Sequence, residues 1–332
     1  MKFAFTADIH LSGYSNDKIV NQLPERLNSL KNVLYQIADY CIENDIYTIV
    51  IGGDILHGKS IIHALAQSIM LEYFRDYTDK LEFIIIDGNH DMSGKGKDAI
   101  SALKSLDNEP NVIRYEEPTM VDDVYFVPWS FDMVESIKNN SAKFLISHFG
   151  LNEGILNSGT SITADIGIPQ LREKYKYVLL GHYHQPQRLR DNEIDIYYVG
   201  SPIQIDWGEK NEEKRFLVVD TETEEITSIP TQGYTKYIEY SITNENKTEV
   251  IEEAKKLQNE GHFVKLVKTE KLDTSKLESD FVVVDKTDRD ITNRGIDSSM
   301  TMDEKMKKFL EIKEIPEDQI DEYMKYGKEC IS

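Results

Sequence analysis

The sequence predicts an α/β protein in which two packed, mainly parallel or mixed sheets are flanked by helices. A small α+β capping domain and C-terminal helices are expected to follow. In the N-terminal part, short β-branched runs alternate with stretches of helical periodicity, which is the pattern of a parallel sheet with helical crossovers. Further along, short strands follow one another closely, as hairpin strands do. Two packed sheets with helices outside accommodate both patterns.

Apolar spacing and turn residues place these elements along the chain. Pro24 suits the first position of a helix and Glu25 its first turn, and apolar residues then repeat at helical spacing to about residue 44. The predicted helices cover residues 24–44, 61–78, 98–106 and 131–139, with a helical turn from residue 168. The predicted strands cover residues 2–7, 46–51, 82–87, 143–148, 177–181, 195–199, 214–220 and 224–229, with short strands within 111–128 and a polar loop over 11–23.

Composition changes near Pro230, and we expect three regions: a large α/β domain over 1–230, a capping domain over 231–286, and a linker with C-terminal helices over 287–332. Within the second region, strands are expected at 236–242, 262–268 and 281–285, with a helix at 246–259. The last two helical patterns, 302–313 and 317–329, have apolar faces too small to fold alone. They either pack back on the body or bind a partner helix.

Bulk properties limit the classes of function. The net charge of −21 argues against a protein that binds nucleic acid through a large basic face. No apolar run is long enough to cross a membrane, and Met1 leads directly into a strand with no signal peptide before it. Cys41 and Cys330 lack metal-ligand spacing, and Cys41 is expected to be a core thiol. The sequence therefore predicts a cytoplasmic protein.

The most informative stretch is residues 86–91, an apolar strand that runs into Gly88, Asn89, His90 and Asp91. Alone it could be an ordinary turn. Other apolar strands, however, end in the same way, and open α/β sheets bind ligands at the carboxyl ends of their strands. Their polar residues are Asp8 and His10, Asp54 with His57 three residues on, His148, and His182 with His184.

These side chains have the chemistry of metal ligands. The candidates are Asp8, His10, Asp54, Asn89, His148, His182 and His184, which are too many for one ion and about right for two that share a carboxylate. Carboxylate, imidazole and amide ligands without thiolate suit Mn, Mg, Fe or Zn. Two such ions can clamp a phosphoryl centre and lower the pKa of an attacking water. The sequence therefore predicts a two-metal site for phosphoryl chemistry.

Five motifs in this order resemble the calcineurin-like metallophosphoesterase superfamily: Asp-x-His, Gly-Gly-Asp, Gly-Asn-His-Asp, His and Gly-His-x-His. Residues 53–57 are similar to the Gly-Asp-apolar-apolar-His of SbcD-type DNA nucleases, and protein Ser/Thr phosphatases differ at both this motif and Gly-Asn-His-Asp. The segments 198–202 and 207–209 with Lys214 resemble the part of SbcD-type subunits that follows Gly-His-x-His. In length and acidity the chain is most similar to the phage version of these subunits.

The resemblance implies roles for the motif residues. One ion would be held by Asp8, His10, Asp54 and His184, and the second by Asp54, Asn89, His148 and His182. His90 would stabilise the transition state or protonate the leaving oxygen, Asp91 would orient His90, and His57 would contact the scissile region of DNA. The products would carry a 3′-hydroxyl and a 5′-phosphate.

The resemblance also implies a cofactor and partners. The cofactor would be two divalent ions, with Mn favoured and Mg as the alternative. The activity would be double-strand exonuclease and single-strand endonuclease on DNA, in recombination, repair and replication. The partner would be an SMC-like ATPase of the SbcC type, on whose coiled coil the C-terminal helices would dock. A homodimer within a heterotetramer would form through residues 24–44 and 61–78.

Beyond the resemblance, four basic residues are candidates for DNA contact. Lys95 and Lys97 lie on a Gly-flanked loop just after Asp91, and Arg188 and Arg190 follow His184. A solvated loop explains the lysines equally well. Because the chain is acidic, we expect its DNA binding without the partner to be weak and salt dependent. Two alternatives to a nuclease stay open: a phosphodiesterase or phosphatase on a small molecule or protein, and a catalytically silent scaffold for the ATPase.

Overall fold

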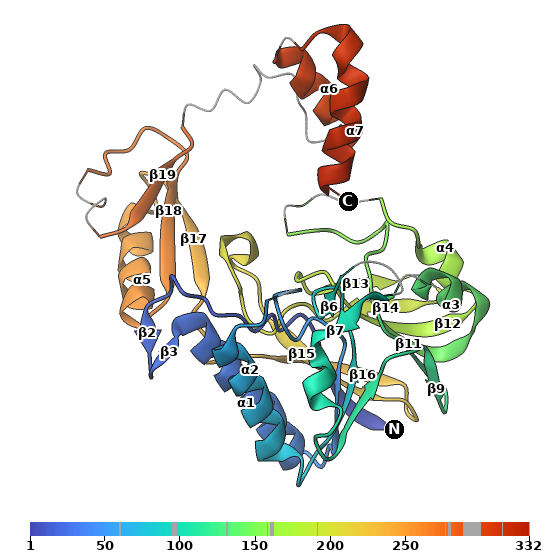
Figure 1. Ribbon diagram of the computed structural model, residues 1–332. Helices are drawn as coiled ribbons and strands as arrows, with labels where there is room; N and C mark the ends of the chain where they lie inside the picture. Colours follow the sequence, from blue (N-terminus) through green and yellow to red (C-terminus); the bar gives the residue numbers. More distant parts are fainter. Residues whose placement is uncertain are drawn as a thin grey trace. The chain divides into compact units, whose positions relative to one another are not determined.

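The computed structural model describes residues 1–332 except 60, 95–97, 131, 158, 160–162, 191, 276, 278–279, 288–299, 314 and 332 (Figure 1). The chain divides into two compact units. The first comprises Met1–Tyr240 and Thr248–Lys265, and the second comprises Ser241–Lys247 and Leu266–Ser332. The candidate ligands all belong to the first unit.

The first sheet has the strand order β16-β15-β1-β4-β5-β8. Its strands are β1 (Lys2–Thr6), β4 (Thr48–Ile51), β5 (Glu82–Ile86), β8 (Val112–Tyr115), β15 (Arg215–Asp220) and β16 (Glu225–Pro230). The pairs β1–β4, β4–β5 and β5–β8 are parallel, whereas β15 runs antiparallel to both β1 and β16. The helical crossovers of the N-terminal part therefore build the parallel strands, and a late hairpin completes the sheet.

The second sheet has the order β13-β14-β12-β11-β10-β9. Its strands are β9 (Thr119–Val121), β10 (Val124–Val127), β11 (Ala142–His148), β12 (Tyr175–Gly181), β13 (Gln187–Arg190) and β14 (Asp195–Tyr198). The neighbours β10, β11, β12 and β14 are parallel, and each edge strand is antiparallel to its neighbour. The carboxyl ends of the central strands therefore lie at one edge of each sheet.

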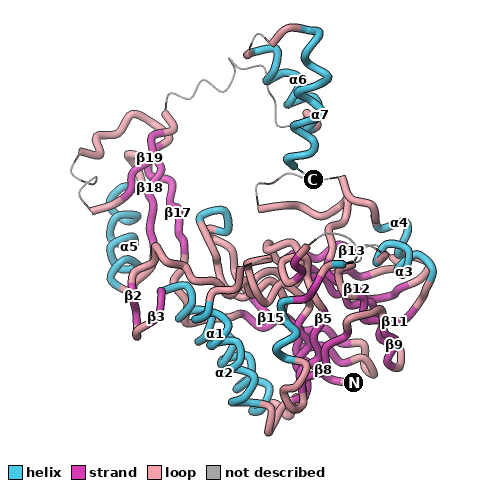
Figure 2. The backbone as a smooth tube through the Cα atoms, in the orientation of Figure 1, coloured by secondary structure: helices cyan, strands magenta, loops and turns pink. Residues whose placement is uncertain are grey.

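Alternating residues of the central strands pack into separate cores. In β4, Val50 packs between the sheets with Phe126 and Phe144 of the second sheet. Its neighbours Ile49 and Ile51 instead pack with the apolar residues of α1 (Glu25–Glu43) and α2 (Ala64–Tyr77). A third cluster joins the second sheet to α3 (Met133–Asn139) and α4 (Ile168–Leu171). Two packed sheets flanked by helices, as the sequence predicts, are confirmed (Figure 2).

Several short elements differ from the sequence prediction. The expected polar loop 11–23 contains a small hairpin of β2 (Ile19–Val20) and β3 (Leu23–Pro24), so that Pro24 precedes α1 instead of opening it. The helix expected at 98–106 is a 3₁₀ helix, η2 (Ala102–Leu106), after a β6 (Met92–Ser93) and β7 (Ile100–Ser101) pair. Strand β13 is not predicted at all. These elements are too short to carry a periodic signal.

The C-terminal part contains β17 (Tyr237–Ile242), α5 (Lys247–Asn259), β18 (Phe263–Lys268) and β19 (Val282–Asp285), with the sheet order β17-β18-β19. Two helices follow, α6 (Met302–Ile312) and α7 (Ile320–Ile331), the latter after η5 (Glu317–Gln319). Thr301 and Glu304 form a capping box that begins α6. Most of the expected linker lies outside the described residues. Within the described residues, no helix has the length and apolar character needed to span a membrane.

Arg114 on β8 offers a test of what stabilises the first sheet. Its guanidinium is 2% exposed and lies 2.9 Å from Asp87, which directly follows β5 and is also buried. We expect Arg114→Met to lower the free energy of unfolding by about 3 kcal/mol, because it leaves the Asp87 carboxylate buried without its counter-ion. Arg75→Met is the control, since the Arg75 side chain is 61% exposed in its pair with Glu109 and should have little effect. Equal urea midpoints for the two variants would contradict this account.

Candidate metal centre

The polar side chains that follow the parallel strands meet at the carboxyl ends of both sheets. Seven side chains reach this place: Asp8 and His10 after β1, Asp54 after β4, Asn89 after β5, His148 at the end of β11, and His182 and His184 after β12. Because β1, β4 and β5 belong to one sheet and β11 and β12 to the other, both sheets contribute. The structure thus brings all seven sequence-predicted ligands together.

Asp54 lies between imidazoles that come from different sheets. Its Oδ2 is 3.3 Å from Nε2 of His148 and 3.5 Å from Nε2 of His10. The second buried carboxylate, that of Asp8, lies 3.9 Å from Nε2 of His148 and accepts the backbone N–H of His182 at 2.9 Å. This central place is the one that a carboxylate shared by two ions would occupy.

The remaining side chains form two groups on either side of Asp54. His10 and His184 face each other with their Nε2 atoms 2.9 Å apart. Oδ1 of Asn89 lies 3.2 Å from Nε2 of His148 and 3.1 Å from Nδ1 of His182. Asp8, His10 and His184 can therefore meet at one ion, as can Asp8, Asp54 and His148.

The donor atoms fit divalent ions. Two nitrogen atoms that bind one ion at right angles, each at about 2.1 Å, lie about 3 Å apart, close to the His10–His184 separation. His148 donates through Nδ1 to the carbonyl oxygen of Gly52 at 2.8 Å, which directs Nε2 toward the acids. Only oxygen and nitrogen donors are present among the seven, a set that does not select among Mn, Mg, Fe and Zn.

Burial and mutual charge shift the pKa values of the acids and histidines at the centre. Burial raises the pKa of Asp8. Burial also opposes ionisation of Asp54, but the neighbouring His148 lowers the pKa of its carboxyl below the usual range. Burial disfavours the charged ring of His148, yet Asp54 and Asp8 raise its pKa to about 9, whereas burial lowers that of His182 to about 3. Burial also disfavours the charged ring of His184, but the hydrogen bond with Glu209 and the charge of Asp8 raise its pKa. The acids of the centre thus favour positive charge on two of its histidine rings.

The backbone at the centre is held in an unusual conformation. Asp8, His10, Asp54 and His182 all have positive φ, between 52° and 92°. Such values cost non-glycine residues free energy and cluster at functional sites. Gly88 allows the closest approach, since a Cβ there would come within 2.2 Å of Oδ1 of Asp54. The loops are thus shaped to present side chains inward, at the expense of local stability.

Asp91 holds these loops together instead of orienting His90. Its carboxylate accepts the backbone N–H groups of Asp54 at 2.7 Å, Gly88 at 2.9 Å and Leu56 at 3.0 Å. The expected contact between Asp91 and His90 is therefore wrong. Burial and the charge of Asp54 raise the pKa of Asp91 to about 8, against the effect of the N–H donors. The ionised form gains support when cations are nearby.

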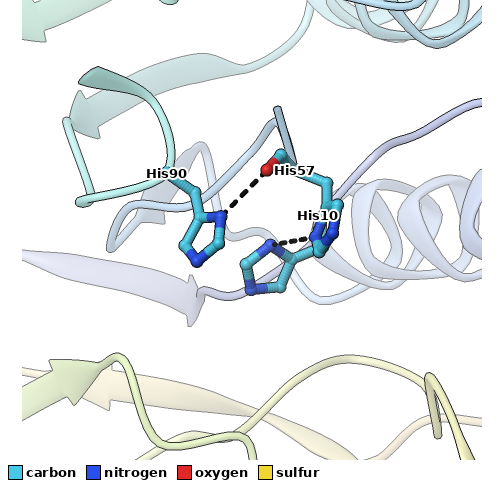
Figure 3. A group of neighbouring side chains, drawn as sticks. All are labelled: His10, His57 and His90. Carbon is cyan, nitrogen blue, oxygen red and sulfur yellow. Dashed lines mark hydrogen bonds between the residues drawn. The ribbon is translucent and has the colours of Figure 1, made fainter. Parts of the chain in front are cut away.

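The ring of His90 is contacted by His57 (Figure 3). The backbone carbonyl of His57 accepts a hydrogen bond from Nδ1 of His90 at 2.9 Å, and the two rings stack with centroids 5.3 Å apart. The side chain of His57 also reaches His10, with their Nδ1 atoms 3.3 Å apart. The backbone N–H of His90 donates to Asp54 at 2.8 Å. His90 is thus fixed beside the ligands by Asp54 and His57.

Glu209 is a buried residue beside the centre to which sequence reasoning gave no role. It ends the 3₁₀ helix η3 (Trp207–Glu209), and its Oε1 lies 2.8 Å from Nδ1 of His184. Burial alone would raise the pKa of Glu209, but His184 and Lys214 lower it to about 2. Residues 207–209 and Lys214 resemble a segment of SbcD-type subunits, and this resemblance was the signal in the sequence that could have drawn attention to them. Their contacts with His184 are seen only in the structure.

Of the four basic candidates, the structure describes Arg188 and Arg190. Arg188 and Arg190 lie on the edge strand β13, and the guanidinium of Arg188 forms an ion pair with Asp195 through Nε at 2.9 Å and Nη2 at 2.5 Å. Lys95 and Lys97 lie outside the described residues. DNA contact by any of the four stays a prediction.

Two curated relatives cover most of the chain. It is 28% identical over 251 residues to exonuclease subunit 1 of Enterobacteria phage T4, covering 69% of this chain and 68% of that protein. It is 25% identical over 307 residues to a subunit of the nuclease SbcCD of Staphylococcus epidermidis, covering 79% and 77%. Both relatives are named as nuclease subunits.

A dimetal phosphatase from Danio rerio is a similar solved structure, with a TM-score of 0.44 and 10% identity over 70% of this chain and 99% of that one. The family model for calcineurin-like phosphoesterases matches residues 1–186, more than half of the sequence. These residues contain the five motifs and all seven candidate ligands. The chain is therefore a member of the calcineurin-like phosphoesterase family, and its acidic and histidine side chains form groups that could hold metal ions.

Proposed function

We propose that this protein is the nuclease subunit of an SMC-like ATPase–nuclease complex, and that it cleaves DNA phosphodiesters with two divalent ions, Mn favoured over Mg. The observation that carries the proposal is the convergence of seven ligands from two sheets, with His90 fixed beside them. The relatives named as nuclease subunits favour DNA over a small molecule. The proposed activities are double-strand exonuclease and single-strand endonuclease, in recombination, repair and replication, with a phage source.

The proposed ligand sets follow the two groups around Asp54. Asp8, His10, Asp54 and His184 would hold one ion, and Asp54, Asn89, His148 and His182 the other, with Asp54 shared. When bound, the ions would polarise the phosphodiester and make water a stronger nucleophile. The protein fixes these ligands through the strained loops and through the backbone bonds to Asp91.

The residue proposed to serve the leaving oxygen is His90. Because Nδ1 of His90 donates to the carbonyl of His57, proton exchange with substrate would use Nε2. A protonated Nε2 could stabilise the transition state or supply a proton to the departing oxygen. His57 would contribute by holding His90, besides the DNA contact expected for its side chain.

The proposed partner accounts for the acidic surface. With a net charge of −21, the chain has little long-range attraction for a polyanion. The bound ions and the ATPase would supply what the surface lacks. Exposed apolar side chains on α6 and α7 support docking there: Phe309 is 50% exposed and Tyr326 is 56% exposed. The three regions 1–230, 231–286 and 287–332 would then be the nuclease, capping and docking parts, with a homodimer formed through α1 and α2.

The first prediction separates chemistry from metal binding. His90→Gln should lower Mn-dependent cleavage of linear duplex DNA by about 10² to 10⁴-fold while Mn binding persists, because His90 moves a proton and holds no ion. Asp54→Asn should abolish both cleavage and binding. His63→Gln, which replaces an exposed histidine outside the centre, should behave as wild type. An active Asp54→Asn variant would reject Asp54 as the shared metal ligand. Intact DNA with the wild type and its ATPase, while an aryl phosphodiester is hydrolysed, would reject the nuclease proposal.

The second prediction concerns pH. Since the pKa of His148 is about 9 in the metal-free protein, this ring is protonated at neutral pH and must lose its proton to bind an ion. Mn affinity should therefore rise about tenfold per pH unit between pH 7 and 8.5 and level off above the pKa. Calorimetry in buffers of different ionisation enthalpy measures the affinity and the released proton together. A pH-independent affinity over this range would contradict the raised pKa of His148 in the metal-free protein.

The third prediction concerns the C-terminal helices. A chain ending at residue 300 should keep Mn-dependent cleavage of single-stranded DNA, because all candidate ligands lie before it. It should lose co-elution with the SMC-like ATPase. The matched variant carries Phe309→Ser and Tyr326→Ser in the full chain and should lose the same interaction. Unchanged co-elution of both variants would place the docking surface elsewhere.

A further inference from the structure

Charged side chains lie buried behind His184, where no substrate would reach them. Glu209 is 3% exposed and the Lys214 side chain is fully buried. Burying charges costs free energy unless each is paired and hydrogen bonded, and apolar residues of similar size often stabilise a fold as well. The contacts of Glu209 and Lys214 therefore indicate what this buried ion pair does for the neighbouring His184.

The carboxylate of Glu209 is saturated with donors. Its Oε1 accepts a hydrogen bond from Nδ1 of His184 at 2.8 Å. Its Oε2 accepts from the hydroxyl of Ser201 at 2.8 Å and from the backbone N–H of Ile205 at 3.2 Å, and lies 2.7 Å from Nζ of Lys214. With this many contacts the carboxylate has a single orientation, and it aims one oxygen at His184.

Lys214 holds the same histidine from its backbone. Its ammonium group donates to the carbonyl oxygen of His184 at 2.9 Å and lies 2.7 Å from a carboxylate oxygen of Glu212. Together with Glu209, these acceptors satisfy all three N–H donors of the ammonium group. One ion pair thus fixes both the ring and the main chain of His184.

This arrangement decides which ring nitrogen of His184 is free. A carboxylate at Nδ1 favours the tautomer with the proton there, so Nε2 keeps a lone pair for a metal, and the charge behind the ring increases its basicity. The corresponding atom of His148 donates to a neutral carbonyl, and Nδ1 of His10 faces the ring of His57. Within the described residues, these two rings have no such carboxylate contact at Nδ1.

We propose that Glu209, with Lys214 as its counter-ion, is a positioning residue that sets the affinity of the metal subsite formed by Asp8, His10 and His184. The inference rests on the proposed two-metal function and deepens it. Of the rings of His10, His148 and His184, the described contacts place a carboxylate at Nδ1 of His184 alone. We therefore expect loss of the Glu209 charge to weaken the subsite that contains His184 and to leave the other subsite unchanged.

The test compares two carboxylates on the same lysine. Glu209→Gln keeps the size of the side chain and its ability to accept from Nδ1, but it removes the charge. Glu212→Gln removes a carboxylate from the same ammonium group without reaching His184. Metal-free full-length proteins are titrated with Mn²⁺ by calorimetry, and urea unfolding compares their stabilities.

We expect Glu209→Gln to weaken one of two Mn²⁺ sites by about 10- to 100-fold and leave the other unchanged. Glu212→Gln should leave both affinities at the wild-type values. Equal losses in the two variants, or no loss in Glu209→Gln, would overturn the inference. A wild type that binds no Mn²⁺ would overturn the metal centre and this inference together, whereas intact metal binding without DNA cleavage would overturn the nuclease proposal alone.

A second readout requires no folded variant at position 209. Histidine ¹⁵N NMR of the metal-free wild type, with His184 assigned by comparison with His184→Gln, reports which ring nitrogen carries the proton. We expect a protonated Nδ1 that donates to the carboxylate. A neutral ring with its proton on Nε2 would overturn the inference.

Discussion

The geometry of the centre depends on one fully buried carboxylate, that of Asp91. Asp91 accepts backbone N–H groups from the loop after β4 and from the loop after β5, and so it fixes the spacing of Asp54 and Asn89. Without it, three buried donors would lack partners, and the loops whose residues have positive φ would relax. The position of the candidate ligand Asp54 is therefore set by the hydrogen bond of its backbone N–H to Asp91 as well as by its side-chain contacts.

The sequence predicts the parts of this site that come from strands. Each of the seven candidate ligands follows an apolar run, and parallel strands bring their carboxyl ends to one edge, so their convergence follows from topology. The partners of Asp91 and Glu209 are not predictable in this way. Asp91 turns back to amides of another loop instead of orienting the adjacent His90, and Glu209 contacts a histidine 25 residues away in the sequence. Such contacts depend on loop conformations that have no periodic signal, as do the short hairpin β2–β3 and the edge strand β13.

Three cations of this acidic chain are paired with acids inside the fold or along the second sheet. Arg114 neutralises Asp87 beside the Gly-Asn-His-Asp turn, Lys214 neutralises Glu209, and Arg188 is paired with Asp195. The first two pairs are buried beside loops that carry candidate ligands, whereas Arg188 is 47% exposed and joins two strands of the second sheet. With a net charge of −21, the chain would rely on bound ions or on another subunit to attract the proposed DNA substrate.

His10 and His184 face each other across 174 residues of sequence. A contact of such high sequence separation carries a large loop-closure cost and belongs to the late stages of folding. During synthesis, the ribosome must release β12 before the histidine pair can exist, and the segment with Glu209 and Lys214 must follow before the pair is secured. A partly made chain can therefore contain β1, β4 and β5 with their acids and still lack His182 and His184, so that the set of candidate ligands is incomplete.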